Sequence, residues 1–233
     1  MNFLNFIILF LSVFIGAFIA FFFKNISSKT TKLLISFSGA YLFSITIIHL
    51  IPEVFTTSHS HHIGFLILIG FFIQIILEHF SQGVEHGHGQ IHGSIPLSIL
   101  IGLCIHSFIE GMPLGISNHS HSHNSLLSAI ALHKIPVGIV LTHLLLQRKM
   151  SNFRIYILLT IFALTTPLGS IFSAYITSIS SYFKEIMAIV IGIFLHISTT
   201  ILFESSEGHN FNSRKTFAII LGSSIAMLST YLG

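Results

Sequence analysis

The sequence predicts an all-α polytopic membrane protein. Of its 233 residues, 52% are hydrophobic and only 7% are charged, and the mean hydropathy is +0.89. Soluble domains have roughly a quarter charged residues, so this composition excludes an ordinary soluble domain. The apolar residues also form segments of bilayer-spanning length, which for a helix is about 20 residues. No stretch between them is long enough to fold separately, so residues 1–233 are expected to form a single transmembrane domain.

Eight segments have this length and character. They cover about 2–23, 33–51, 63–81, 95–117, 125–147, 155–178, 185–205 and 216–232. Each is expected to be a helix, because a spanning segment must satisfy its backbone groups internally. The first follows Met1 and Asn2 without the basic region and cleavage site of a signal peptide, so it is expected to be a span.

The basic residues of the loops orient the predicted bundle. Eight of the nine loop cations fall on one face, namely Lys24, Lys29, Lys32, Arg148, Lys149, Arg154, Arg214 and Lys215, whereas Lys184 falls on the other. The positive-inside rule makes the first face cytoplasmic, so both termini are expected outside. The net charge of +3 lies in short loops and indicates topology rather than nucleic-acid binding. The small loops favour a bacterial cytoplasmic membrane over a eukaryotic one.

The fourth and fifth segments carry ionisable residues at bilayer depth. His106 and Glu110 are four residues apart and share a helix face, and His133 lies at a similar depth on the next helix. Such groups are costly in a membrane and are usually functional. Imidazole and carboxylate ligands without a thiolate suggest a site for a borderline divalent cation. The alternative is a pair of buried histidines that tie helices together. The short connection predicts that the two helices are antiparallel neighbours.

Prolines and glycines accompany these groups. Pro113 and Pro136 leave the carbonyls of Ile109 and Leu132 without their helical partners, close to the predicted site. Small residues allow close helix contact, and the fourth segment has three of them in Gly102, Gly111 and Gly115.

Lys134 is a cation inside the fifth segment and is expected to modulate the site. It can pair with Glu110, lose its proton through desolvation, or take the place of a second metal ion. The alternative, a lysine that snorkels to the interface, fits its central position poorly.

Further polar residues mark a possible path. His49 and Glu53 are expected at the outer entrance, and outer loops around 58–62 and 119–123 are rich in histidine. Exit candidates are Glu78, His79, His86, His88, His92 and His143, with Glu204, Glu207 and His209 nearby. For each residue alone, an ordinary polar helix end or loop is the alternative. His196 lies deeper in the seventh segment and has no assigned role.

These motifs resemble the ZIP family of divalent-metal transporters. The segment His106-Ser-Phe-Ile-Glu110-Gly111 is similar to the family's His-[Asn/Ser]-x-x-Glu-Gly, and His133-Lys-Ile-Pro136-Val137-Gly138 is similar to its His-x-x-Pro-Glu-Gly. His49-Leu-Ile-Pro52-Glu53 looks like the family's outer-mouth motif, and weaker likenesses are Thr166-Pro167-Leu168-Gly169 and Gly192-Ile-Phe194-Leu195.

The resemblance implies uptake of Zn²⁺ or Fe²⁺ toward the cytosol. It implies an inverted repeat of the first three and last three helices around the fourth and fifth, and a homodimer. It also implies His106, Glu110 and His133 as metal ligands, with Ser107 at a second site. Val137 and Lys134 stand where many members have acidic residues, so one metal ion is expected rather than two.

We therefore expect divalent-cation transport, with Zn²⁺ first and Fe²⁺, Mn²⁺ or Cd²⁺ as other substrates. A passive cation channel and a haem-binding membrane protein are the alternatives. The chain has neither the HExxH motif of a metalloprotease nor a P-loop, and an enzyme is not expected. The cation is expected as substrate, with no resident cofactor, and the other partner is the lipid bilayer.

Overall fold

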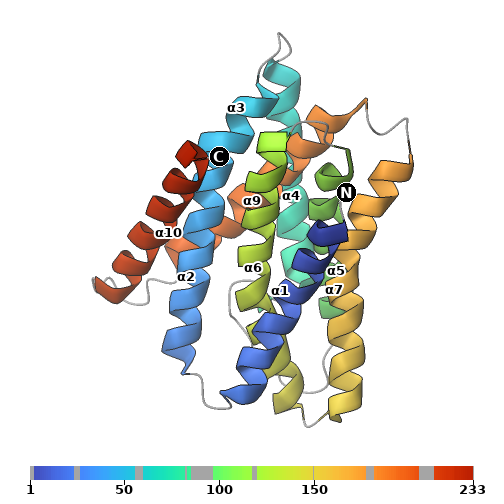
Figure 1. The fold of residues 1–233 in the computed structure, drawn as a ribbon, viewed down its shortest axis with the longest axis vertical. Helices are drawn as coiled ribbons and strands as arrows, with labels where there is room; N and C mark the ends of the chain where they lie inside the picture. Colours follow the sequence, from blue (N-terminus) through green and yellow to red (C-terminus); the bar gives the residue numbers. More distant parts are fainter. Residues whose placement is uncertain are drawn as a thin grey trace.

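The computed structural model describes residues 3–23, 27–55, 60–81, 83–84, 97–116, 120–148, 150–176, 181–204 and 213–232. Its elements are α1 (Phe3–Phe22), α2 (Ser28–Ile45), η1 (Thr46–Leu50), α3 (Ile51–Val54), α4 (Ser60–Ser81), α5 (Leu97–Ile116), α6 (Ser120–Gln147), α7 (Asn152–Tyr175), α9 (Phe183–Glu204) and α10 (Ser213–Leu232) (Figure 1). Because α2, η1 and α3 are continuous, these elements make eight long helical segments, and the described residues contain no strand.

Seven of these segments are long and apolar enough to cross a membrane. The all-α, multi-pass prediction is therefore confirmed. The exception is α10, which begins with Arg214 and Lys215 and is rich in Ser and Thr, so its role as an eighth span stays a prediction. Two predicted segments were too short at their starts: α2 begins at Ser28 rather than near residue 33, and α6 begins at Ser120 rather than near residue 125.

Successive segments run in opposite directions, and both termini lie toward the same end of the bundle (Figure 1). The opposite end holds the ends of α1 and α6 and the starts of α2 and α7, while α9 ends and α10 begins part-way toward it. The described loop cations of the predicted cytoplasmic face lie in these places, namely Lys29, Lys32, Arg148, Arg154, Arg214 and Lys215. Charge therefore separates the two ends as the sequence predicted.

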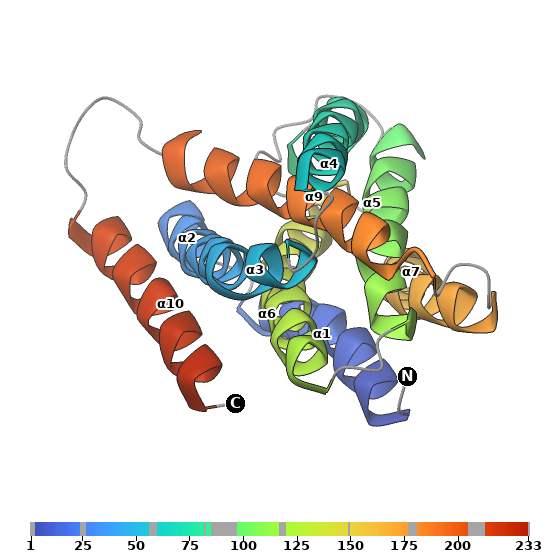
Figure 2. The same cartoon turned by 90° about the horizontal axis from the view of Figure 1, so that it is seen from above.

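The closest helix pairs join segments that are not adjacent in the sequence. The most extensive contacts are those of α5 with α7, α1 with α6, α4 with α9, and α2 with α10 (Figures 1 and 2). The prediction that the fourth and fifth segments are neighbours was thus only partly right: α5 and α6 run antiparallel but touch over a short stretch. The four pairs are related by an exchange of α1 with α7, α2 with α9, α4 with α10, and α5 with α6. Each pair then becomes another of the four, as expected for an inverted repeat of the first three and last three segments.

Glycines explain why these pairs are the close ones. A Cβ added to Gly111 or Gly115 of α5 would come within 3.0 Å of the α7 carbonyls of Thr166 and Ser170. Glycines on both helices line the contact surface, or seam, of two other pairs: Gly16 and Gly138 between α1 and α6, and Gly70 and Gly192 between α4 and α9. Without water in the bilayer to drive helices together, such backbone-to-backbone packing is what selects partners.

One proline reshapes the second segment. The π-helical turn η1 ends two residues before Pro52, and the amide of Ile51 donates to the carbonyl of Thr46, five residues back. Pro52 has no amide hydrogen for the carbonyl of Ile48, and its ring would clash with that carbonyl in a regular helix. The wider turn avoids the clash. It also means that His49 and Glu53 are not stacked on one α-helical face as their spacing suggested.

We expect valine at Gly70 to destabilise the bundle, because its Cβ would collide with the backbone of Ile189 on α9. Overpacking of this kind costs about 1–3 kcal/mol. The matched control is Gly64→Val on the same helix, where nothing lies within 4 Å of the added carbon. Thermal unfolding in detergent measures the difference, and equal midpoints for the two variants would contradict the role assigned to the seam.

Candidate metal centre

His106 and Glu110 lie at the middle of α5 and face each other. The distance from His106 Nε2 to Glu110 Oε2 is 3.1 Å, and their side chains are 3% and 0% exposed. Two ligands bound tetrahedrally to Zn²⁺ at 2.0–2.1 Å are about 3.3 Å apart, so this spacing is close to the bite of one cation. The predicted pairing of these two residues through one helical turn is therefore present in the structure.

His133 approaches the pair from α6. Its ring is buried, and its centroid lies 6.4 Å from that of His106 with the planes nearly perpendicular. Within the described parts of the chain, however, no three His, Cys, Asp or Glu side chains are close enough to enclose a metal ion. For His133 to share a cation with His106 and Glu110, its ring has to move toward them.

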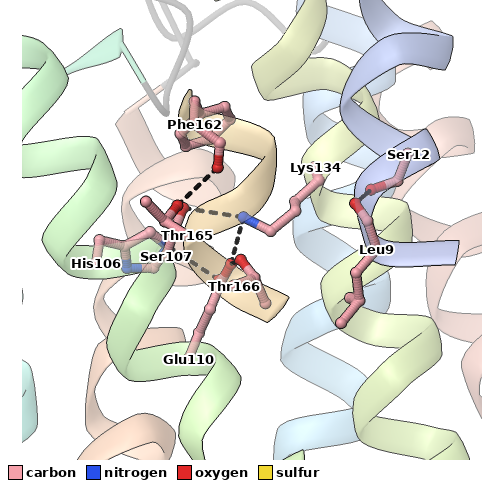
Figure 3. Close-up of polar contacts among 9 residues, drawn as sticks. All are labelled: Leu9, Ser12, His106, Ser107, Glu110, Lys134, Phe162, Thr165 and Thr166. Carbon is pink, nitrogen blue, oxygen red and sulfur yellow. Dashed lines mark hydrogen bonds and ion pairs between the residues drawn. The ribbon is translucent and has the colours of Figure 1, made fainter. Parts of the chain in front are cut away.

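Lys134 makes the closest contact with Glu110. Its Nζ lies 2.5 Å from Glu110 Oε1 and 2.9 Å from Ser107 Oγ, and the side chain is almost completely buried (Figure 3). Its charge also lies 4.8 Å from the centre of the Phe162 ring. Of the predicted alternatives, the structure contains the pair with Glu110, and burial excludes snorkelling. The ammonium group thus contacts both Glu110 and Ser107, the residue that the resemblance places at a second metal site.

Thr166 completes the surroundings of Glu110 from α7. Its hydroxyl donates to Glu110 Oε1 at 3.1 Å (Figure 3). One carboxylate oxygen is thus held by Lys134 and Thr166, while the other faces His106. Sequence reasoning missed Thr166 and Phe162 as site residues. The Thr166-Pro167 pair in mid-segment was a signal for the first, but no pattern pointed to the second.

Val137 follows His133 by one helical turn and is 3% exposed. Its apolar side chain brings no ligand to the place where the family pattern has a glutamate. The central group therefore contains one carboxylate and one lysine.

The predicted path residues divide into those that are brought together and those that are not. His49 and Glu53 are partly buried on η1 and α3, toward the end with the termini. Glu78 contacts His196 of α9 rather than its neighbour His79, which is exposed against Phe80.

His143 is partly buried near the end of α6. Several other predicted residues lie outside the described residues, or have side chains that do: His59, Glu85, His86, His88, His92, His119, His121, His123, Glu204, Glu207 and His209.

Comparison with known proteins decides the family. The family described as "ZIP Zinc transporter" matches residues 85–230, which include the whole central group. The chain belongs to the ZIP family.

Its curated relatives include zinc and iron proteins. Protein zntD of Dictyostelium discoideum is 27% identical over 162 residues, covering 60% of this chain and 24% of the relative. Zinc transporter 5 of Oryza sativa subsp. japonica is 28% identical over 113 residues, covering 41% and 32%. Fe(2+) transport protein 1 of Arabidopsis thaliana is 28% identical over 75 residues, covering 32% and 22%. The chain therefore spans a third or less of the length of these relatives.

We expect Lys134→Met to lower the free energy of unfolding, because it leaves the buried Glu110 carboxylate without its cation. Breaking a buried ion pair from one side costs about 3–5 kcal/mol. The double variant Glu110→Gln/Lys134→Met removes both charges and should recover much of the loss. Unfolding in metal-free detergent is the measurement. The exposed Lys29→Met is the control, and equal losses in the two lysine variants would contradict a structural role for the pair.

Proposed function

We propose that this ZIP family protein carries divalent metal cations across a membrane into the cytoplasm, with Zn²⁺ as the first substrate and Fe²⁺, Mn²⁺ and Cd²⁺ as others. The observation that supports this best is the His106–Glu110 pair, buried at mid-helix with the spacing of two ligands to one cation. Its motif lies inside the region that matches the family. The relatives named for zinc and for Fe(2+) transport support the same class of substrate.

In this proposal one cation binds at a time. Neutral His106 and His133 supply nitrogen ligands, and Glu110 supplies Oε2, the oxygen that Lys134 does not hold. The Lys134 ammonium remains on Oε1 and excludes a second cation by charge repulsion and by occupying the space beside Ser107. Because Val137 adds no charge, the site binds the cation more weakly and less selectively than a site with two carboxylates would.

Transport toward the cytoplasm is the direction that the family resemblance implies, and the distribution of charge supports the orientation of the bundle in this proposal. The basic end of the bundle faces the cytoplasm and both termini lie outside, in keeping with the positive-inside rule. His49 and Glu53 then receive the cation, and a conformational change closes this side and opens the other. Glu78 and His143 lie toward the release side, and His86, His88 and His92 stay predicted exit residues.

Further properties belong to the same proposal. The protein is a homodimer, carries its cation as substrate without a resident cofactor, and is not an enzyme. The proposed location is a bacterial cytoplasmic membrane, because the loops are small. The relatives reported above come from an amoeba and from plants.

We expect His106→Ala and Glu110→Ala to reduce Zn²⁺ uptake by proteoliposomes to the level of protein-free vesicles, since each removes a ligand of the only central pair in the described residues. The control is Ile76→Ala, which changes an exposed apolar residue of α4 that has no place in the proposed path. Monodisperse elution in gel filtration confirms that the variants are folded. Uptake at the wild-type rate in both ligand variants would refute the site.

We expect Thr166→Val to weaken Zn²⁺ binding, because it removes the hydroxyl that orients the Glu110 carboxylate. Loss of a group that orients a ligand typically reduces affinity or activity by about 10–100-fold. The control is Thr165→Val, whose hydroxyl donates at 2.6 Å to the Phe162 carbonyl within its own helix. Concentration dependence of uptake gives the apparent affinity, and indistinguishable threonine variants would argue against the orienting role.

A further inference from the structure

A second histidine–carboxylate pair lies between α4 and α9. His196 Nε2 is 3.4 Å from Glu78 Oε2, and the two side chains are 10% and 24% exposed. The His196 ring also packs edge-on against Phe71, with 4.9 Å between centroids, so its position is fixed by an apolar neighbour as well as by Glu78. The central site does not use either residue.

The separation of the two atoms is informative. Charge-assisted hydrogen bonds between nitrogen and carboxylate oxygen are shorter, about 2.7–2.9 Å. The observed 3.4 Å is instead close to the roughly 3.3 Å between two tetrahedral ligands of Zn²⁺. The central pair, at 3.1 Å, has a similar spacing, and in both pairs a histidine Nε2 faces a glutamate carboxylate oxygen.

The helix packing keeps this geometry in place. Gly70 and Gly192 bring the backbones of α4 and α9 into direct contact, and His196 follows Gly192 by one turn. A seam fixed by backbone contact leaves little freedom for the two side chains to separate.

The pair also lies on the release side of the central site. Gly102 of α5 packs against α4 at Leu77, Phe80 and Ser81, the turn that contains Glu78. Gly102 precedes His106 by four residues, about 6 Å along the helix, toward the end away from the termini. A cation that leaves His106 toward that end therefore passes the level of Glu78 within about one turn.

We propose that Glu78 and His196 form a second binding site for a borderline divalent cation, with water completing its coordination, and that the transported cation binds there after it leaves the central site. The binding part of this proposal stands on the pair itself, whereas the transit part rests on the proposed transport function. One neutral imidazole and one carboxylate suit Zn²⁺ or Cd²⁺. Partial exposure lets water reach the cation, as a transient site requires.

A thiolate in place of His196 gives a direct test of binding. In a Cys104→Ser background, His196→Cys should produce the ultraviolet charge-transfer band of a Cd²⁺–thiolate bond when Cd²⁺ is added. This band does not respond to Cd²⁺ held by the loop histidines. Adding Glu78→Gln should weaken the apparent Cd²⁺ affinity at least about tenfold, the lower limit for loss of a supporting group. Adding Ile76→Ala, an exposed apolar residue of α4 two positions before Glu78, should leave the affinity unchanged.

A reciprocal variant tests whether misfolding of the first variant explains its result. Glu78→Cys with His196 retained should give the same band, weakened by His196→Phe, which preserves the ring packing on Phe71. An affinity unchanged by the partner substitution in both designs would overturn the proposal and leave Glu78–His196 as a hydrogen bond only.

Two further measurements separate this inference from the proposed function. The Cd²⁺–thiolate band should persist when His106→Ala is added, because the second site does not depend on the central one. Zn²⁺ uptake should fall at least about tenfold in both Glu78→Gln and His196→Phe but not in the exposed-site control Ile76→Ala. Retained binding with unchanged uptake would refute transit through the pair, whereas loss of the band in His106→Ala would refute its independence.

Discussion

Glu110 is a carboxylate with no exposed surface at the centre of a membrane-length helix, and its charge has to be balanced inside the protein. An uncompensated ion in that environment costs several kcal/mol, so three helices converge on it. Lys134 of α6 supplies a positive charge, Thr166 of α7 donates a hydrogen bond, and His106 of α5 faces the remaining oxygen. The arrangement of α5, α6 and α7 therefore depends on compensating the charge of the Glu110 side chain.

Close backbone packing makes that convergence possible. Thr166 reaches Glu110 because Gly111 and Gly115 let α7 approach α5 without intervening side chains. The same device joins α1 to α6 and α4 to α9, so the bundle consists of glycine-lined pairs rather than of sequential hairpins. The site residues on α5 and α6 meet over a short stretch because each of these helices has its main partner elsewhere.

The charges distinguish this chain within its family pattern. A lysine in place of an acidic residue, together with Val137, turns the central group into one carboxylate balanced by one ammonium. A divalent cation adds net positive charge to such a group, so tight binding is not favoured by Coulomb attraction alone. The Glu78–His196 pair, by contrast, has no lysine among the contacts described for it.

The sequence by itself determined the fold class, the approximate spans, the charge asymmetry of the two ends and the His106–Glu110 pair. Each of these depends on hydropathy or on spacing within one helix, and both can be read along the chain. Only the tertiary structure decided that Lys134 binds Glu110 and Ser107, that Thr166 and Phe162 join them, and that Glu78 pairs with His196 instead of His79. It also decided that α5 packs on α7 rather than mainly on α6. These contacts join helices distant in sequence, and they depend on which glycine seams form and on the phase of each helix about its axis, which no local pattern fixes.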